Sequence, residues 1–140
     1  MDNTPSILLV EDERIIAIAQ KQLLETSGLT VCLAHSGLEA IEAVRDDRAV
    51  SLLLMDINLG EGIDGIETAE RILADRELPI VFLTGQSDRA TLERARKVHH
   101  YGYLPKAAGC FAVVQAVHTA LSLFNSIQSA RAEANAAREE

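Results

Sequence analysis

Short, almost wholly apolar runs alternate with stretches whose apolar residues recur every three or four positions, and this alternation constrains the fold most. The apolar runs cover residues 7–10, 30–34, 50–55, 80–83 and 101–105. Helical spacing follows each run, at about 13–26, 38–45, 66–74 and 87–98 and from about 109 onward. Continuous apolar strands are typical of a parallel sheet that helices cover on both faces. The sequence therefore predicts an α/β fold, with a doubly wound five-stranded parallel sheet and five helices.

Polar and glycine residues mark the ends of several predicted helices. Ser36 and Glu39 have the spacing of a capping box, in which the two side chains satisfy free N–H groups at the helix start. Gly28 stands where a C-terminal cap is expected, and Ser87 or Asp88 can cap the fourth helix. These signals agree with the boundaries that the apolar spacing gives.

Composition narrows the class of protein. The 140 residues suit one compact domain, and apolar residues make up 48% of them. The net charge of −8 argues against non-specific binding to nucleic acid or to an anionic membrane, because both need excess basic residues. No continuous apolar run approaches the ~20 residues of a membrane span, and the N-terminus lacks the basic region of a signal peptide. We therefore predict a cytoplasmic location.

The two cysteines, Cys32 and Cys110, have no metal-ligand spacing. Both stand among apolar residues, so we predict two small buried thiols. Unpaired buried thiols fit a reducing compartment and are consistent with the predicted location.

Chemically active residues follow four of the predicted strands. Glu11 and Asp12 come after the first strand, Asp56 after the third, Thr84 after the fourth and Lys106 after the fifth. In doubly wound sheets, ligands bind beyond the carboxyl ends of the strands, where the winding direction switches. The sequence therefore predicts that these side chains converge on one crevice.

Three carboxylates that lie close together repel one another unless one takes a proton or a cation lies among them. Hard oxygen ligands with room for water suit Mg2+. Phosphoryl transfer to Asp56 needs groups that neutralise the negative charge of the phosphoryl oxygens. A cation, a lysine ammonium and a threonine hydroxyl beside this carboxylate would supply them. Each residue alone also has an ordinary reading, as a helix cap, a turn residue or a surface charge. The ordered occurrence of all of them at strand ends is what favours the chemical reading.

Five segments of the chain match a known family pattern. They are Ile7-Leu8-Leu9-Val10-Glu11-Asp12-Glu13, Leu53-Leu54-Met55-Asp56-Ile57, Asp64-Gly65-Ile66-Glu67, Phe82-Leu83-Thr84-Gly85 and Gly102-Tyr103-Leu104-Pro105-Lys106. With these segments the chain resembles the chemotaxis-regulator-like receiver domains of response regulators in two-component signalling, over about residues 6–124. The resemblance implies a flavodoxin-like three-layer sandwich with the strand order 2-1-3-4-5.

The resemblance implies a phosphoprotein of a phosphorelay. A histidine kinase or a phosphotransfer protein would present a phosphohistidine, and Asp56 would accept its phosphoryl group. Asp12, Asp56 and the backbone carbonyl of Asn58 would bind Mg2+ directly, while Glu11 would act through water.

The resemblance also implies how the signal leaves the site. Thr84 and Lys106 would contact the phosphoryl oxygens, and a shift of Thr84 would let Tyr103 turn inward and change the output surface. The alternative for Tyr103 is a partly buried ring whose hydroxyl lies in water. The output would pass to a downstream protein or to a covalently linked domain of a longer signalling protein.

Two departures from the family pattern affect the expected geometry. Ala107 follows Lys106 where receivers usually have proline, so a cis peptide bond is not expected there. The loop after Asp56 also lacks the usual proline, and with residues 59–63 it is about one residue longer than the family pattern. Asn58 and Gln86 occupy positions that tune the dephosphorylation rate in this family.

Two other functions stay open. A receiver fold could serve as a protein-interaction module that phosphorylation does not regulate. An aspartyl-nucleophile phosphatase, as in haloacid-dehalogenase-like enzymes, would need a second aspartate two residues after Asp56, where this chain has Asn58. We therefore expect no enzyme, but a phosphoacceptor that assists its own phosphorylation and dephosphorylation.

The C-terminal segment differs from a receiver. We predict a receiver domain at 1–124 and a helical extension or linker at 125–140, because the apolar stripe turns mostly to alanine after Ile127. The extension could lead to a further domain, could form a homodimer, or could be a frayed solvated helix.

Overall fold

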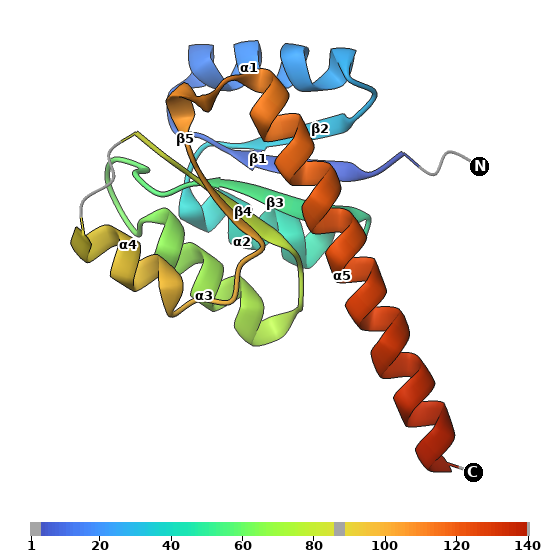
Figure 1. The fold of residues 1–140 in the computed structure, drawn as a ribbon. Helices are drawn as coiled ribbons and strands as arrows, with labels where there is room; N and C mark the ends of the chain where they lie inside the picture. The colour runs from blue at the N-terminus through green and yellow to red at the C-terminus, as the bar shows by residue number, and fades with distance from the viewer. Residues whose placement is uncertain (1–3, 86–88, 140) are drawn as a thin grey trace.

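The computed structural model describes residues 4–85 and 89–139, drawn in Figure 1. The strands are β1 (Ser6–Val10), β2 (Thr30–Ala34), β3 (Val50–Asp56), β4 (Ile80–Thr84) and β5 (Gly102–Pro105). The helices are α1 (Arg14–Thr26), α2 (Gly37–Asp46), α3 (Gly65–Asp75), α4 (Arg89–Arg96) and α5 (Cys110–Glu139), with a short 3-10 helix, Lys106–Ala108, before α5. The predicted alternation of strands and helices is confirmed, while Gln86, Ser87 and Asp88 lie outside the described residues.

The five strands form one parallel sheet in the order β2-β1-β3-β4-β5. This order confirms the doubly wound topology that the resemblance implied. The chain leaves β1 for β2 and then returns to the other side of β1 to form β3, so β1 and β3 flank the switch in winding direction. Val10 pairs with Met55 at that place, which brings the residues that follow both strands to the same edge of the sheet.

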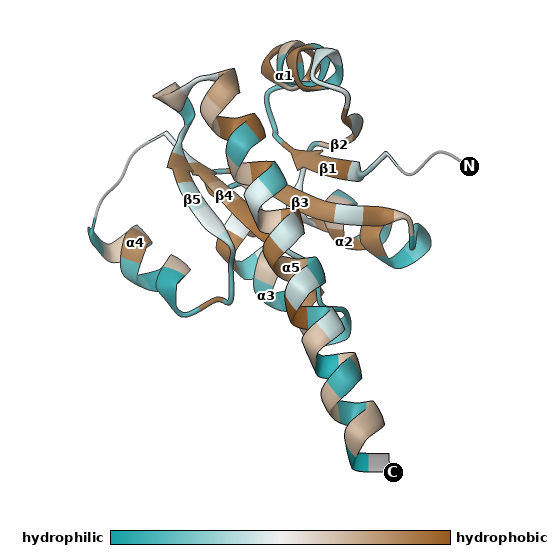
Figure 2. Cartoon of the chain, turned by 45° about the vertical axis from the view of Figure 1, so that its right-hand side comes forward, coloured by the Kyte–Doolittle hydropathy of each residue, from teal (hydrophilic) through white to brown (hydrophobic). Residues whose placement is uncertain are grey.

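Helices cover both faces of the sheet, as Figures 1 and 2 show. Leu53 and Met55 of β3 pack toward α2, α3 and α4, and the alternate residues Leu52 and Leu54 pack toward α1 and α5. All four side chains are at most 1% exposed. Burial on both faces explains why β3 is a continuous apolar run rather than an alternating one.

Side chains cap the helices that lead to the site. The Ser36 hydroxyl accepts a hydrogen bond from the Glu39 backbone N–H at 3.1 Å, as the capping-box spacing predicted. Asp64 caps α3 in the same way and accepts from the Glu67 N–H at 2.9 Å. Gly28 adopts a φ of 90° immediately after the C-cap residue Ser27 of α1, which confirms its role at the C-terminal end of this helix.

The prediction of two buried thiols is wrong. Cys32 is exposed and Cys110 is only half-buried. Cys32 lies on β2, which is the edge strand of the sheet, so the helix layer does not cover it completely. The apolar residues around a cysteine do not reveal whether its strand lies at the edge or in the centre.

Helix α5 has 30 residues and extends beyond the body of the sheet (Figure 1). By length and composition it is the one described helix that could cross a membrane, contrary to the expectation that no segment qualifies. The expectation was based on continuous apolar runs alone. Helix α5 is apolar on average, but polar residues such as Gln115 and His118 interrupt its sequence. Such a finding is weak evidence of a membrane span, and Val113, Val114 and Val117 of the same helix pack on the sheet.

Candidate functional site

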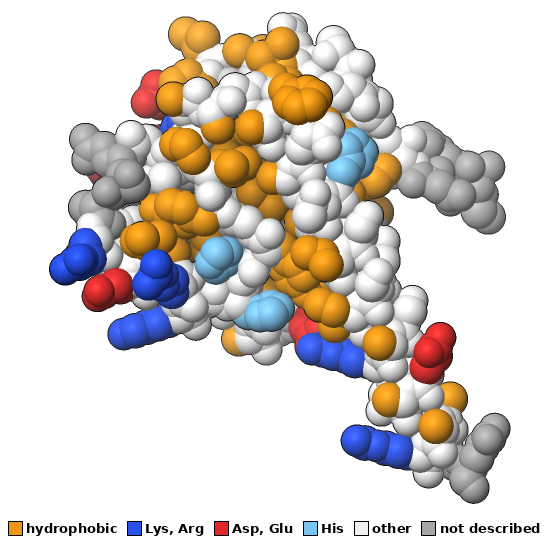
Figure 3. All heavy atoms as spheres, viewed as in Figure 1, with side chains coloured by type: hydrophobic (Ala, Val, Ile, Leu, Met, Phe, Trp, Pro, Cys, Tyr) orange, Lys and Arg blue, Asp and Glu red, His pale blue; other side chains and the backbone are white. Residues whose placement is uncertain are grey.

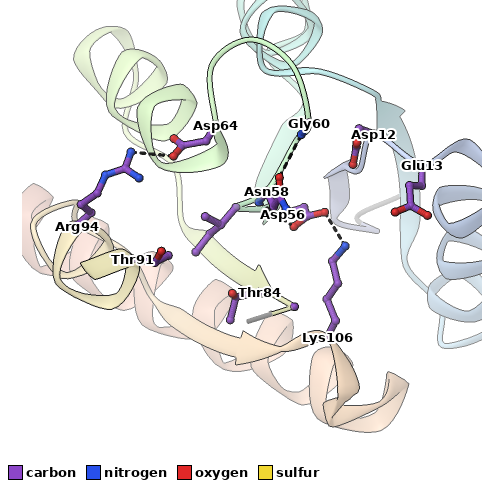
Figure 4. A pocket seen from close by; sticks show the side chains of 12 residues that line it. Asp12, Glu13, Asp56, Asn58, Gly60, Asp64, Thr84, Thr91, Arg94 and Lys106 are labelled. Carbon is purple, nitrogen blue, oxygen red and sulfur yellow. Dashed lines mark hydrogen bonds and ion pairs between the residues drawn. The ribbon is translucent and has the colours of Figure 1, made fainter. Parts of the chain in front are cut away.

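The predicted site residues converge at the carboxyl edge of the sheet. Asp56 is the last residue of β3 and Thr84 the last of β4, while Glu11 follows β1 and Lys106 follows β5. A cavity of about 630 Å³ opens at this edge, and its lining includes Asp12, Asp56, Asn58, Thr84 and Lys106. Figure 4 shows these side chains entering it from separate elements. Glu11 and Tyr103 are predicted site residues that do not line the cavity.

Lys106 bridges two buried carboxylates. Its Nζ lies 2.6 Å from Asp56 Oδ2 and 2.8 Å from Glu11 Oε1. Glu11 and Asp56 are each only 1% exposed, so both charges depend on this ammonium. Burial lowers the pKa of Lys106, but the two carboxylates raise it more, and the amine stays charged. The spacing of the sequence placed Lys106 at the site, but it did not predict the contact with Glu11.

The acids of the site titrate unequally. Burial raises the pKa of Glu11, but hydrogen bonds from Lys106 and the Glu13 N–H lower it more, so the net shift is downward. Burial raises the pKa of Asp56 to about 6, with a further rise from Glu11 and a partial offset from Lys106. The pKa of Asp12 is raised by burial and then by Glu11. One lysine therefore leaves the cluster with uncompensated negative charge.

This cluster fits a divalent cation. Glu11, Asp12 and Asp56 each offer a carboxylate oxygen, and the three oxygens lie within 4.8 Å of one another. The Asn58 backbone N–H donates to Asp56 Oδ1 at 3.2 Å, which fixes that carboxylate beside the cavity. Carboxylate and carbonyl oxygens are the ligands that Mg2+ prefers, and a cation here would offset the burial and the repulsion that raise the pKa values of Asp12 and Asp56.

Glycines bring the loop after β3 close to the acids. Gly60 has a φ of 74°, and a Cβ atom there would lie 3.0 Å from Asp12 Oδ2. A Cβ atom on Gly65 would overlap the backbone carbonyl oxygen of Asp56. The loop therefore closes over the site without a proline, although the family pattern has one. All peptide bonds of the described residues are trans, including the bond after Lys106, as the change to Ala107 predicted.

An ion pair that the sequence analysis missed crosses the rim of the cavity. Arg94 of α4 lies 2.8 Å from the carboxylate of Asp64, the residue that caps α3 (Figure 4). Both side chains line the cavity together with Thr91. Arg94 sits among exposed polar residues of α4, and nothing in its spacing separates it from an ordinary surface charge.

The side chain of Tyr103 points into the protein and not into water. Its ring packs against the buried cluster beneath α2, α3 and α4, and its hydroxyl oxygen is buried with no hydrogen-bond partner among residues 4–85 and 89–139. The alternative reading, with the hydroxyl in water, is therefore wrong. Thr84 is also buried, at 5% exposure. In the register of β4 and β5, Phe82 pairs with Tyr103 and Thr84 with Pro105, so Tyr103 lies two residues before the partner of Thr84.

Comparison with known proteins gives a consistent picture. The family model for the response regulator receiver domain matches residues 7–118. The transcriptional regulatory protein PdtaR of Mycobacterium tuberculosis is 32% identical over 91% of this chain and 62% of its own length. The C4-dicarboxylate transport transcriptional regulatory protein DctD of Rhizobium meliloti is 32% identical over 86% of this chain and 26% of its own length. The chain thus spans between a quarter and two thirds of these curated relatives.

Solved structures agree in fold. The N-terminal domain of a response regulator/sensory box/GGDEF three-domain protein from Carboxydothermus hydrogenoformans has a TM-score of 0.80 and 40% identity. The match covers 86% of this chain and 97% of that domain. A CheY-like receiver domain protein from Methanospirillum hungatei has a TM-score of 0.82 over 89% of this chain and 98% of its own, at 22% identity. The second likeness concerns the fold alone.

Proposed function

Because this chain belongs to the response regulator receiver domain family, we propose that it is a phosphorylation-dependent switch of a two-component system. Asp56 accepts the phosphoryl group of a phosphohistidine on a histidine kinase or a phosphotransfer protein. A carboxylate oxygen of Asp56 forms a bond to phosphorus as the bond from phosphorus to the histidine nitrogen breaks. The histidine leaves as a neutral imidazole after it takes up a proton.

One observation carries this proposal. Asp56 is buried at the carboxyl end of β3, and its Oδ2 lies 2.6 Å from the Lys106 ammonium. A carboxylate that is desolvated yet charged is a suitable nucleophile, and the ammonium can neutralise the oxygens of the incoming group. The Thr84 hydroxyl, at the end of the neighbouring strand, is a second group for those oxygens.

We propose that Asp12, Asp56 and the backbone carbonyl of Asn58 hold Mg2+, with Glu11 acting through water. A bound Mg2+ would neutralise charge on the phosphoryl oxygens. Glu11 also keeps Lys106 in place through the 2.8 Å contact, so its role does not depend on the cation alone.

Phosphorylation reaches the surface through Thr84 and Tyr103 in this proposal. The added charge favours a position of Thr84 nearer to Asp56. The space that Thr84 leaves beside β5 then favours the inward position of the Tyr103 side chain. The Tyr103 hydroxyl is buried without a hydrogen-bond partner among the described residues, and this costs roughly 1–3 kcal/mol, which opposes the inward position. The face formed by α4, β5 and α5 would change with it.

The output passes to another protein or to a linked domain. The relatives are longer than this chain, and a similar receiver precedes a sensory box and a GGDEF domain in the three-domain protein. We propose a receiver at 1–124 and a helical linker at 125–140 on this basis. No direct contact with nucleic acid is part of the proposal, since the chain carries a net charge of −8.

Intact mass after incubation with acetyl phosphate and Mg2+ tests the switch. The parent is expected to gain one phosphoryl group, and Asp56→Asn is expected to gain none. Asp64→Asn is the matched control, because Asp64 also lines the cavity but points toward Arg94. It keeps a side-chain oxygen for the α3 cap and is expected to be labelled like the parent.

Each contrary result has a definite meaning. A parent that stays unlabelled would contradict the switch and favour a receiver fold that acts as an unregulated interaction module. Equal labelling of Asp56→Asn would contradict the site. Sustained release of phosphate from p-nitrophenyl phosphate would favour the aspartyl phosphatase, which the amide at Asn58 in place of an acid argues against.

A further inference from the structure

The last turns of α5 leave the body of the protein. Every side chain described from 129 to 138 is exposed, and Figure 1 shows this part of the helix projecting away from the sheet. Contacts to the body are polar and involve Glu77, which accepts from Gln128 at 3.0 Å and from Arg131 at 2.7 Å. Exposed ion pairs contribute little, and an isolated helical segment of this length is marginal in water. The segment is expected to be stable only with a partner.

A heptad stripe runs along this segment. It consists of Leu123, Ile127, Ala130, Ala134 and Ala137, at alternating spacings of four and three residues. Leu123 is 49% exposed and Ile127 36%, which makes them two of the large apolar side chains that the fold leaves in water. Hydrophobic side chains are visible at the surface along α5 in Figure 3. Apolar residues at the first and fourth heptad positions are the seam of a coiled coil.

Charged residues beside the heptad stripe indicate which kind of helix can pair with α5. In heptad terms Glu133 is a g position and Arg138 the e position five residues later, which are the positions that pair between helices of a parallel coiled coil. Neither residue has an ion pair within the described part of the chain. The other e position with a charge, Arg131, is already paired with Glu77 and faces an uncharged g residue, Ser126. The helix is therefore complementary in charge to a parallel copy of itself.

We infer that α5 pairs with α5 of a second copy of this chain as a parallel coiled coil over residues 123–138. An antiparallel pair would lose this attraction, because e then meets e and g meets g, so Glu133 no longer lies beside Arg138 of the other helix. The alanines at 130, 134 and 137 let the two backbones approach closely. The interface does not rest on the proposed phosphorylation, since none of its residues lines the site cavity.

Sedimentation equilibrium of the full chain tests the interface. The average mass is expected to rise toward that of a dimer between roughly 10 µM and 1 mM, in the range of weak association. Leu123→Asp with Ile127→Asp is expected to raise the dissociation constant at least about tenfold. Ala130→Asp with Ala134→Asp, at exposed positions, is expected to do the same without loss of folding. A monomeric parent at all concentrations would overturn the inference.

A matched control separates the stripe from charge alone. Asn125→Asp with Ser129→Asp adds the same negative charge at two exposed outward positions of the same helix. This variant is expected to associate like the parent. An equal loss of association in the control would show that the heptad stripe is not the interface.

Cross-linking tests the orientation. Ala137→Cys, with Cys32 and Cys110 replaced by serine, is expected to form an intermolecular disulfide, because equivalent seam positions face each other in a parallel pair. An antiparallel pair centred on Ala130 would hold the two thiols roughly 20 Å apart. Ser129→Cys in the same background points outward and serves as the control. Equal cross-linking of both variants would overturn the parallel arrangement.

Discussion

A single aspartate, Asp56, shows how the surroundings change the acid–base properties of an ordinary side chain. Asp56 is 1% exposed, and burial raises its pKa to about 6 although Lys106 lies 2.6 Å away. Glu11 competes for the same ammonium at 2.8 Å, so the lysine charge is shared between two acids. The residue is therefore ionised near neutral pH at a cost to stability. Functional sites commonly store such a cost.

The raised pKa predicts how stability changes with pH. In buffer without Mg2+, a folded Asp56 holds its proton more tightly than the unfolded chain, so its contribution is fully present below the unfolded pKa of about 4. That contribution is lost as the pH rises through about 6. Urea unfolding is expected to show the parent losing on the order of 2 kcal/mol relative to Asp56→Asn between about pH 4 and 7. A difference that stays constant over this range would contradict the raised pKa.

At the scale of elements, the loop and the start of α3 are packed directly on the end of β3. Gly65, the first residue of α3, donates its N–H to the Ile57 carbonyl at 2.8 Å. Its missing side chain leaves space that the Asp56 carbonyl oxygen occupies. Gly65 therefore ties the backbone of Asp56, the proposed phosphoacceptor, to α3.

Gly65→Ala is expected to destabilise the protein strongly. The new Cβ atom would overlap backbone, which cannot move away as a flexible side chain can, so a loss of about 2–4 kcal/mol is expected in urea unfolding. Gly102→Ala is the comparison, because its Cβ atom would meet Val81 at 3.5 Å, an ordinary contact. Its change is expected to stay within about 1 kcal/mol. Equal losses in the two variants would show that the close approach at Gly65 does not matter.

Helices and strands could be predicted from the sequence where the residues that determine them lie close together along the chain. Apolar runs and caps such as Ser36 gave the strands and helices within a few residues, and the strand ends placed Asp56, Thr84 and Lys106 at one edge. The Lys106–Glu11 pair was not predictable, because it joins residues 95 positions apart and depends on side-chain packing. The exposure of Cys32 was also hidden, since the apolar pattern does not separate an edge strand from a central one.

At the scale of the whole molecule, the fold supplies two separate regions. The acidic site lies at one edge of the sheet, where β1, β3, β4 and β5 end. The projecting end of α5 lies away from it, past the Glu77 contacts (Figure 1). A change in charge at the site alters the free energy of unfolding of the whole chain, whereas a change in the α5 stripe alters the dissociation constant of the proposed dimer. The two are therefore open to independent measurement.

Addition of Mg2+ is expected to stabilise the whole folded chain through the site. The uncompensated acids bind a cation only when Glu11, Asp12 and Asp56 are held within 4.8 Å, which the unfolded chain does not do. At ten times the dissociation constant, binding to the folded state alone raises the free energy of unfolding by about 1.4 kcal/mol. The gain is expected to shrink below about pH 6, because protons on Asp56 then compete with the cation.

Asp12→Asn is expected to lose most of the gain in urea unfolding at matched ionic strength. Asp64→Asn changes a rim acid that is paired with Arg94, and this variant is expected to retain the gain. Stabilisation of all three proteins to the same extent would mean that Mg2+ acts as a general counterion and not at these acids.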